Sequence, residues 1–173
     1  INGACAGLGL VTALNSDIRF AAEEAKITTA FARRGLPAEE AVSWLLPRVV
    51  GHAVALDLLL SGRVILGDEA AMIGLVHRAV PREELLSAAM DYARDLAVHC
   101  SPLAMATAKR QVYLDWQRSM RESRDDAVRL IPRLKAAGDF REGVRSYVEK
   151  RAASFSPHTA HIDYTDLGEM ADE

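Results

Sequence analysis

The chain opens with a run of small residues that passes directly into an apolar helical pattern. Residues 2–7 read Asn-Gly-Ala-Cys-Ala-Gly, and residues 8–14 (LGLVTAL) carry the helical pattern. Glycine allows turns closed to other residues and a close approach of the backbone to a ligand. The first amides of a helix have no partner inside it. This start can therefore pack a helix tightly against a strand, or hold an anion or a developing oxyanion.

Further short motifs follow this turn in a fixed order. They occupy residues 15–22 (NSDIRFAA), 25–27 (AKI), 33–37 (RRGLP), 46–51 (LPRVVG), 59–62 (LLSG), 69–76 (EAAMIGLV), 140–143 (FREG) and 149–151 (EKR). In this order and spacing, over residues 1–155, the chain resembles the enoyl-CoA hydratase/isomerase (crotonase) superfamily. The resemblance implies an α/β fold: the second half of a crotonase-like ββα spiral core, followed by a C-terminal helical trimerisation region.

The resemblance divides the chain into three segments. Residues 1–80 correspond to the second half of the core, and residues 81–155 to the helical region that makes trimer contacts and covers the active site in the family. Residues 156–173 are polar and mildly acidic, which is typical of a flexible tail. Family members carry the first half of the core upstream. We therefore expect the sequence to be a piece of a longer protein that continues before Ile1.

Hydrophobic periodicity and turn residues predict short strands first and mainly helices later. Pro47 is expected to close or kink its helix, and Asp68 and Gly74 are expected to cap theirs. Strands are expected at residues 17–22, 26–29 and 75–80, and helices at 39–46, 53–60, 68–73, 81–99, 102–116, 121–137 and 139–152.

Composition argues against several classes of partner. The formal net charge is −3, which does not favour a nucleic-acid surface. No apolar run reaches the roughly 18 residues that span a bilayer, so we expect no membrane partner and a cytoplasmic location. The two cysteines, Cys5 and Cys100, and the five histidines fit no metal or disulfide framework. We expect reduced thiols, no metal, and no cofactor beyond the coenzyme A of the substrate.

The resemblance places two apolar residues where the hydratases carry their pair of glutamates. These residues are Val11, in the first helical pattern, and Phe31, in Ala30-Phe31. Adding water across a conjugated double bond needs a base for the water and a proton for the α-carbon. Valine and phenylalanine supply neither. The sequence therefore predicts a protein of this family that lacks the hydratase glutamate pair.

A carboxylate occurs nearby at Glu39, where the resemblance places a catalytic acid of the dienoyl-CoA isomerases. Glu39 is therefore our candidate base. In the alternative interpretation, Glu39 and Glu40 are ordinary acids at a helix start, where the helix dipole favours them. Leu8 aligns with the residue whose backbone amide is the second donor of the family's oxyanion hole. Such a donor can lower a barrier by about 3 kcal/mol.

The remaining candidates are substrate-binding residues. Gly7, Phe31 and Trp44 are expected near the acyl group, although Trp44 also fits the core. The resemblance places Tyr147 and Lys150 near the pantetheine and adenine-phosphate end of coenzyme A. The alternative is an exposed amphipathic helix on which Lys150 is simply solvated.

Three functions are compatible with these residues. The first is an enzyme that acts on an acyl-CoA thioester through an enolate stabilised by an oxyanion hole, with Glu39 as a single base for isomerisation or an altered hydration. The second is an acyl-CoA-binding protein of crotonase fold without hydratase activity. The third is a structural or assembly subunit. The resemblance implies acyl-CoA as the ligand and a homo-trimer or hexamer as the assembly.

Overall fold

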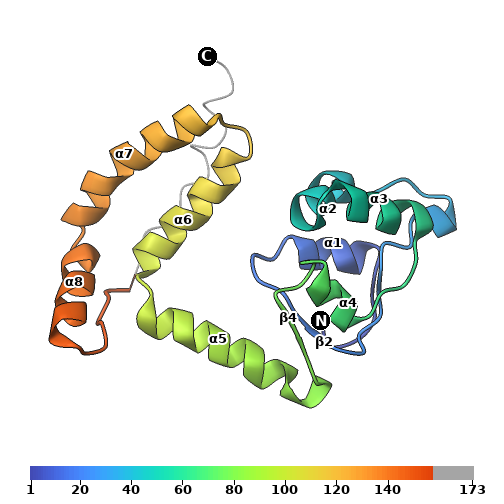
Figure 1. Ribbon diagram of the computed structural model, residues 1–173, viewed down its shortest axis with the longest axis horizontal. Coiled ribbons are helices and arrows are strands. Elements are labelled where there is room, and N and C mark those ends of the chain that lie inside the picture. Colours follow the sequence, from blue (N-terminus) through green and yellow to red (C-terminus); the bar gives the residue numbers. More distant parts are fainter. Residues whose placement is uncertain (158–173) are drawn as a thin grey trace. The chain divides into compact units, whose positions relative to one another are not determined.

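The structure, a computed structural model that describes residues 1–157, divides into two compact units (Figure 1). Unit 1 covers Ile1–Asp91, and unit 2 begins at Tyr92. This division falls inside helix α5 (Leu85–His99), so residue 80, where the sequence suggested a boundary, lies within unit 1. Most of the segment expected to be a flexible tail, from residue 158 on, lies outside the described residues.

Unit 1 contains two small parallel sheets. Strand β1 (Cys5–Ala6) pairs with β3 (Ile27–Thr28), and β2 (Phe20–Ala22) pairs with β4 (Arg78–Val80). Ile65 adds an antiparallel bridge to β3. Strand β2 is buried along its whole length. Such burial is expected of parallel strands, because both faces of a parallel sheet are usually covered.

Four helices pack around these strands (Figure 1). They are α1 (Leu8–Leu14), α2 (Val42–Val50), α3 (His52–Ser61) and α4 (Gly67–Met72). Helix α1 contacts β1 and α2, α2 packs on α3, and α4 packs on β2 and β4. Their buried side chains form one apolar core, in which the largest inaccessible hydrophobic residues are Leu10, Ile27, Leu46, Ile65, Leu75 and Val42.

The strands are shorter than the sequence predicted, and β1 was expected to be part of a turn. The predicted strand at 17–22 begins only at residue 20, because the Arg19 side chain holds the preceding turn. Its guanidinium donates to the carbonyls of Ser16, at 2.6 Å, and Leu75, at 2.7 Å. Leu75 and Val76 are buried, but they lie in a loop before β4 and not in a strand.

The helix predicted at 39–46 begins later and extends further. Glu40 and Ala41 have φ values of +47° and +58°, which lie outside the right-handed helical region. Helix α2 therefore starts at Val42. Pro47 lies inside α2 and does not end it, so of the two predicted effects the stop is wrong and the kink stays a prediction. Proline removes one helical hydrogen bond, but its fixed φ is compatible with a helix.

The caps predicted for α4 are also corrected by the structure. The N-cap is Leu66 rather than Asp68, and the C-cap is Ile73, followed by Gly74 with φ +75°. Gly67 is the first helical residue because it lies directly against the backbone of β2. A Cβ at this position would stand 2.0 Å from the carbonyl oxygen of Ala22 and 2.9 Å from its carbonyl carbon. Only glycine fits here without moving a strand.

Gly67→Ala is expected to lower the free energy of unfolding by at least about 3 kcal/mol, because a new methyl group must displace backbone atoms of β2. Gly9→Ala is the matched control. Gly9 lies in α1, and no atom stands within 4 Å of the place that an alanine methyl would take, so alanine should stabilise by about 0.5–1 kcal/mol. Chemical denaturation of both variants measures the difference. Equal free energies of unfolding for the two variants would show that α4 can move away from β2 at no cost.

The regular elements of unit 2, as far as residue 157, are helices. After α5 come α6 (Pro102–Asp115), α7 (Met120–Ala136) and α8 (Asp139–Glu149). Helix α7 contacts both α6 and α8 (Figure 1). The helices predicted at 102–116 and 121–137 are confirmed to within one residue at each end. The last helix ends at residue 149, earlier than predicted, because Lys150 adopts φ +53°.

A buried carboxylate joins α6 to α7. Asp126 is only 8% exposed, and three guanidinium groups surround it. The N–O distances are 3.2 Å to Arg118, 3.3 Å to Arg129 and 3.7 Å to Arg110. A buried charge is costly unless it is paired and hydrogen-bonded. This network therefore fixes the turn between the two helices.

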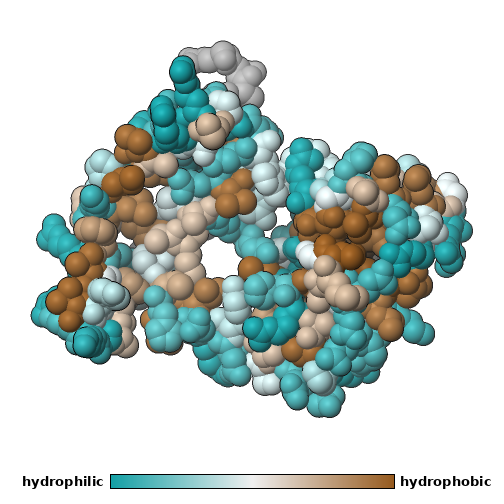
Figure 2. All heavy atoms as spheres, in the orientation of Figure 1, coloured by the Kyte–Doolittle hydropathy of each residue, from teal (hydrophilic) through white to brown (hydrophobic). Residues whose placement is uncertain are grey.

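Large apolar side chains remain on the surface of unit 2 (Figure 2). Those on α7 and α8 that are at least half exposed are Met120, Val128, Ile131, Phe140, Val144, Tyr147 and Val148. Extended apolar surfaces are unusual on monomers and typical of protein–protein contacts. No helix in the described part of the chain is both long and apolar enough to cross a membrane.

Candidate functional site

The glycine turn between β1 and α1 presents a backbone amide. Gly7 has φ +53° and ψ −121°, and its N–H donates to the carbonyl of Thr28 at 3.2 Å, which ties the turn to β3. The Gly7 carbonyl accepts from the Leu10 amide at 3.0 Å. The amide of Leu8 has no acceptor within residues 1–157. As the first residue of a helix, Leu8 can offer this N–H to a ligand.

Phe31 lies beside this turn. A Cβ on Gly7 would be 3.8 Å from Cε1 of Phe31, so the structure brings these two predicted residues together. Phe31 and Val11 are each 5% exposed and belong to the apolar core. The two positions that the resemblance assigns to glutamates are therefore filled by buried hydrocarbon, which excludes water and does not bind it.

The segment that carries Phe31 and Glu39 is bounded by residues with left-handed backbone. At its start Ala30 has φ +60°, and the Phe31 amide donates to the Thr29 carbonyl at 2.8 Å across it. At its end Glu40 and Ala41 also have positive φ. Non-glycine residues in sparsely populated regions cost roughly 1–3 kcal/mol each. Strained backbone therefore flanks the candidate base on one side and the candidate acyl contact on the other.

Glu39 lies in the connection before α2. Its carbonyl accepts from the Val42 amide at 3.0 Å, and the residue is half-buried. No hydrogen bond or ion pair to its carboxylate occurs among residues 1–157. Glu39 and Glu40 lie outside the first turn of α2 and directly precede its N-cap, Ala41. That the two residues are ordinary acids at a helix start stays a prediction.

Trp44 lies on α2 outside the core. Trp44 is 38% exposed, so the alternative prediction that its side chain packs in the core is wrong. The Arg48 guanidinium stands 3.9 Å from the ring centroid and donates to the Trp44 carbonyl at 2.9 Å. The guanidinium stacks on the partly exposed Trp44 ring, and this cation–π contact holds the ring in one orientation.

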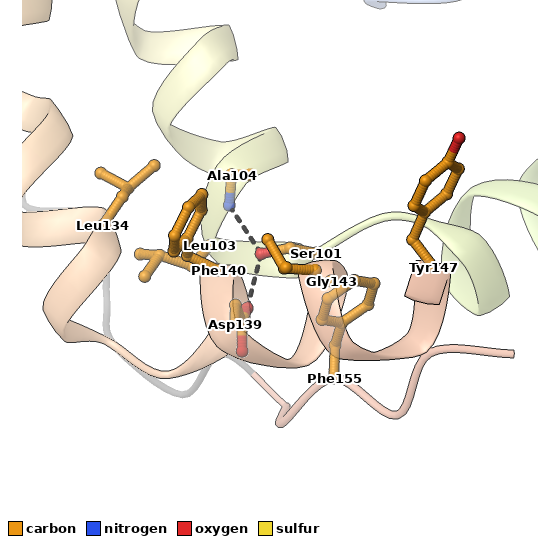
Figure 3. Close-up of a pocket in the computed structure, with 10 residues that line it drawn as sticks. Ser101, Leu103, Ala104, Leu134, Asp139, Phe140, Gly143, Tyr147 and Phe155 are labelled. Atoms are coloured by element: carbon orange, nitrogen blue, oxygen red, sulfur yellow. Dashed lines mark hydrogen bonds between the residues drawn. The ribbon is translucent and has the colours of Figure 1, made fainter. Parts of the chain in front are cut away.

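Tyr147 lines a cavity of about 500 Å³ in unit 2 (Figure 3). Ser101 donates from Oγ to Asp139 at 2.5 Å and accepts from the Ala104 amide at 3.1 Å, which joins the start of α6 to α8. The Tyr147 ring stands apart from the other labelled side chains (Figure 3), and Lys150 follows at the exposed end of α8. The other walls are mainly apolar: Leu103, Ala104, Leu134, Phe140, Gly143, Val144 and Phe155.

The chain after α8 folds back on that helix. Arg151 binds both carboxylate oxygens of Glu142, at 2.6 and 3.0 Å, and the Ser154 amide donates to the same group at 2.8 Å. These contacts place Phe155 against Gly143, where it forms one wall of the cavity. The Arg151 side chain first, and the Ser154 amide next, lower the pKa of Glu142 to about 2. Sequence reasoning missed Phe155, which follows the last helix and belongs to no periodic pattern.

Acid is expected to release residues 151–155 from α8. The Glu142 pKa of about 2 in the folded state lies below the ordinary value of about 4.3, so the charged form stabilises the folded arrangement. This contribution is complete above pH ~4.3 and is lost as the pH falls towards 2. Hydrogen exchange of the Ser154 amide measures the release.

Glu142→Gln should expose the Ser154 amide already at neutral pH, whereas Glu83→Gln, an exposed acid in unit 1, should not. Protection of the Ser154 amide that persists unchanged to pH ~2 would contradict the assignment of Glu142 as the holding group.

Burial lowers the reactivity of one of the two cysteines. Cys5 is buried, and desolvation raises the pKa of its thiol. Because the thiolate is the nucleophile, this change makes Cys5 less reactive. Within residues 1–157, no group of three or more His, Cys, Asp and Glu side chains is placed to hold a metal ion.

Comparisons with known proteins point to one family. A sequence model described as enoyl-CoA hydratase/isomerase matches residues 1–158. Enoyl-CoA hydratase ACTT3 of Alternaria alternata is 35% identical over 156 residues, covering 90% of this chain and 52% of that protein. The 1,2-epoxyphenylacetyl-CoA isomerase of Escherichia coli (strain K12) is 34% identical over 157 residues, covering 90% of this chain and 59% of that protein.

Solved structures show the same fold. The crystal structure of a probable enoyl-CoA hydratase/isomerase from Mycobacterium abscessus has a TM-score of 0.87 at 32% identity, and the match covers 91% of this chain and 62% of that one. The chain thus spans just over half the length of the curated relatives named above.

Proposed function

The chain belongs to the enoyl-CoA hydratase/isomerase family, and from this premise we propose that it forms part of an enzyme acting on an acyl-CoA thioester through an enolate. The observation that carries the proposal is the Leu8 amide at the glycine turn, which has no acceptor in the described part of the chain. In a family of thioester chemistry, such a donor is suited to the oxygen that gains charge when the thioester enolises. A backbone donor is also independent of the side chain at its position.

In the proposed reaction Glu39 is the base. Its carboxylate removes a proton from the carbon next to the thioester carbonyl, and the electron pair moves onto the carbonyl oxygen. The Leu8 amide donates to this oxygen and contributes about 3 kcal/mol to the lowering of the barrier. With a β,γ-unsaturated substrate, return of the proton to the γ-carbon moves the double bond to the α,β-position. In the reverse direction the base removes a γ-proton from the α,β-unsaturated substrate and returns it to the α-carbon. Glu39 is half-buried, and its carboxylate has no partner among the residues that the structure describes, which supports this role.

The second candidate is an acyl-CoA-binding protein without hydratase activity. It is favoured by the burial of Val11 and Phe31, which leaves hydrocarbon at both positions of the family's glutamate pair. In this case the glycine turn and Phe31 bind the thioester, and Glu39 performs no proton transfer. A structural or assembly subunit, the third candidate, is supported by the exposed apolar surface of α7 and α8.

For the coenzyme A end of the substrate we propose Tyr147 and Lys150. Tyr147 is 85% exposed at one end of an apolar cavity, and Lys150 is an exposed cation three residues later. An aromatic ring can cover an adenine or the pantetheine chain, and an ammonium group suits a phosphate. Gly7, Phe31 and Trp44 are proposed for the acyl end.

Proton exchange in heavy water tests the proposal. The full-length protein is incubated with acyl-CoAs of several chain lengths, and NMR follows the α- and γ-protons. Exchange supports the enzyme. Binding measured by calorimetry without exchange supports the second candidate, and neither binding nor exchange supports the third.

We propose a homo-trimer or hexamer, because α7 and α8 leave apolar side chains uncovered. Light scattering of the full-length protein at micromolar concentration is expected to give the mass of three or six chains. Val128→Glu, which places a charge on a side chain that is now 61% exposed, should shift the protein towards smaller species. Arg133→Glu changes an exposed polar position on the same helix and is the control. A stable folded monomer of the unmodified protein would refute the assembly.

A further inference from the structure

Four residues other than glycine have positive φ in the described part of the chain: Ala30, Glu40, Ala41 and Lys150. Lys150 has an ordinary explanation, because it ends α8, where a left-handed residue is common. Glu40 and Ala41 are consecutive, and they directly follow the candidate base Glu39. This pair has no comparable explanation in helix termination, since it precedes a helix.

The pair forms a tight turn. The Glu39 carbonyl accepts from the Val42 amide at 3.0 Å across Glu40 and Ala41. Positive φ at both central residues, +47° and +58°, is the pattern of a type I′ turn, in which glycine, asparagine and aspartate dominate. Here the positions hold glutamate and alanine. Both residues are exposed, so side-chain packing does not require a residue larger than glycine.

The turn is held by the helix that follows it. The Ala41 carbonyl accepts from the amides of Trp44 and Leu45, at 2.9 and 3.0 Å, and Val42 and Leu46 anchor α2 in the core. A strained backbone conformation is maintained only where the surrounding contacts stabilise it, and such conformations are more frequent at functional sites. A glycine pair would relieve the strain, but it would also let the preceding residue move more freely.

We propose that the Glu40–Ala41 turn is a positioning device that holds Glu39 in one backbone conformation for proton abstraction. The inference rests on the proposed function of Glu39. In this arrangement Glu40 and Ala41 act on the reaction through the position of Glu39 and not through contact with the substrate. The side-chain carbons at these positions limit the conformations open to the turn, and the geometry of the base is thereby fixed before substrate arrives.

Ala41→Gly in the full-length protein tests the device. Removing the strain should raise the midpoint of thermal unfolding by about 2–4 °C. The same change should lower the rate of α-proton exchange by about 10-fold or more, because small displacements of a base are costly, with substrate affinity changed by no more than about two-fold. Ala137→Gly is the matched control. Ala137 is exposed with φ −73°, so glycine there adds freedom without relieving strain and should leave the exchange rate unchanged.

The outcomes separate this inference from the proposed function. If Glu39→Gln abolishes exchange but Ala41→Gly exchanges as fast as the unmodified protein, the positioning device is overturned and the function of Glu39 stands. A melting point that fails to rise also overturns the device. If the unmodified protein shows no exchange, or Glu39→Gln exchanges equally fast, the proposed function fails and this inference fails with it. Adding Ala41→Gly to Glu39→Gln should cause no further loss.

Discussion

Replacing Glu39 by glutamine is expected to slow the exchange of substrate α- and γ-protons with solvent deuterium by about 10²–10⁴-fold, the range of general base catalysis. Glutamine keeps the size and most of the hydrogen bonding of the side chain but cannot take a proton at neutral pH. Acyl-CoA affinity should stay within a few-fold, because the Leu8 amide and the apolar contacts are unchanged. NMR in heavy water gives the exchange rate, and calorimetry gives the affinity.

Glu23→Gln supplies a control for the loss of one negative charge. Glu23 is exposed, follows β2, and lies outside the candidate site. Equal exchange rates in the unmodified protein and the Glu39→Gln variant would show that this carboxylate has no part in proton transfer. A parallel fall in the Glu23→Gln variant would point to net charge and not to a positioned base.

Hydration of crotonyl-CoA by the full-length protein is expected to be at least roughly 10⁴-fold slower than by an enzyme with two glutamates, since each acid–base group contributes about 10²–10⁴-fold. Because positions 11 and 31 hold valine and phenylalanine, neither carries a carboxylate that could activate water or protonate the α-carbon. Both side chains are also buried. The decrease in ultraviolet absorbance of the conjugated thioester measures the rate. Turnover within about tenfold of a two-glutamate enzyme would contradict the prediction and point to another pair of groups.

The helices of unit 2 could be predicted from the sequence because their signals are local. Ser119 and Glu122 form a capping box at the start of α7, and Ser101 caps α6 directly before a proline. The strands of unit 1 gave weaker signals, because segments of two or three residues are too short to show alternation. The start of α2 was placed wrongly because nothing in the types of Glu40 and Ala41 indicates a left-handed backbone.

The candidate site was predictable only in part for a related reason. The resemblance supplied the positions of Gly7, Leu8 and Glu39, but the contact between Gly7 and Phe31 depends on how β1, β3 and the following turn pack. The wall that Phe155 gives to the cavity depends on the Arg151–Glu142 pair beyond the last helix. Segments without hydrophobic periodicity give no signal in the sequence, so the contacts between them can be identified only in the three-dimensional structure.

The unequal burial of the two cysteines has a practical consequence. Cys5 is buried with a raised thiol pKa, whereas Cys100 is half-exposed and directly precedes the Ser101 that binds Asp139. A thiolate is the species that attacks a maleimide, so a fluorescent dye added in limiting amount should attach within this sequence at Cys100. Its emission would then report on the junction of α5 and α6, beside the apolar cavity, without any engineered attachment point.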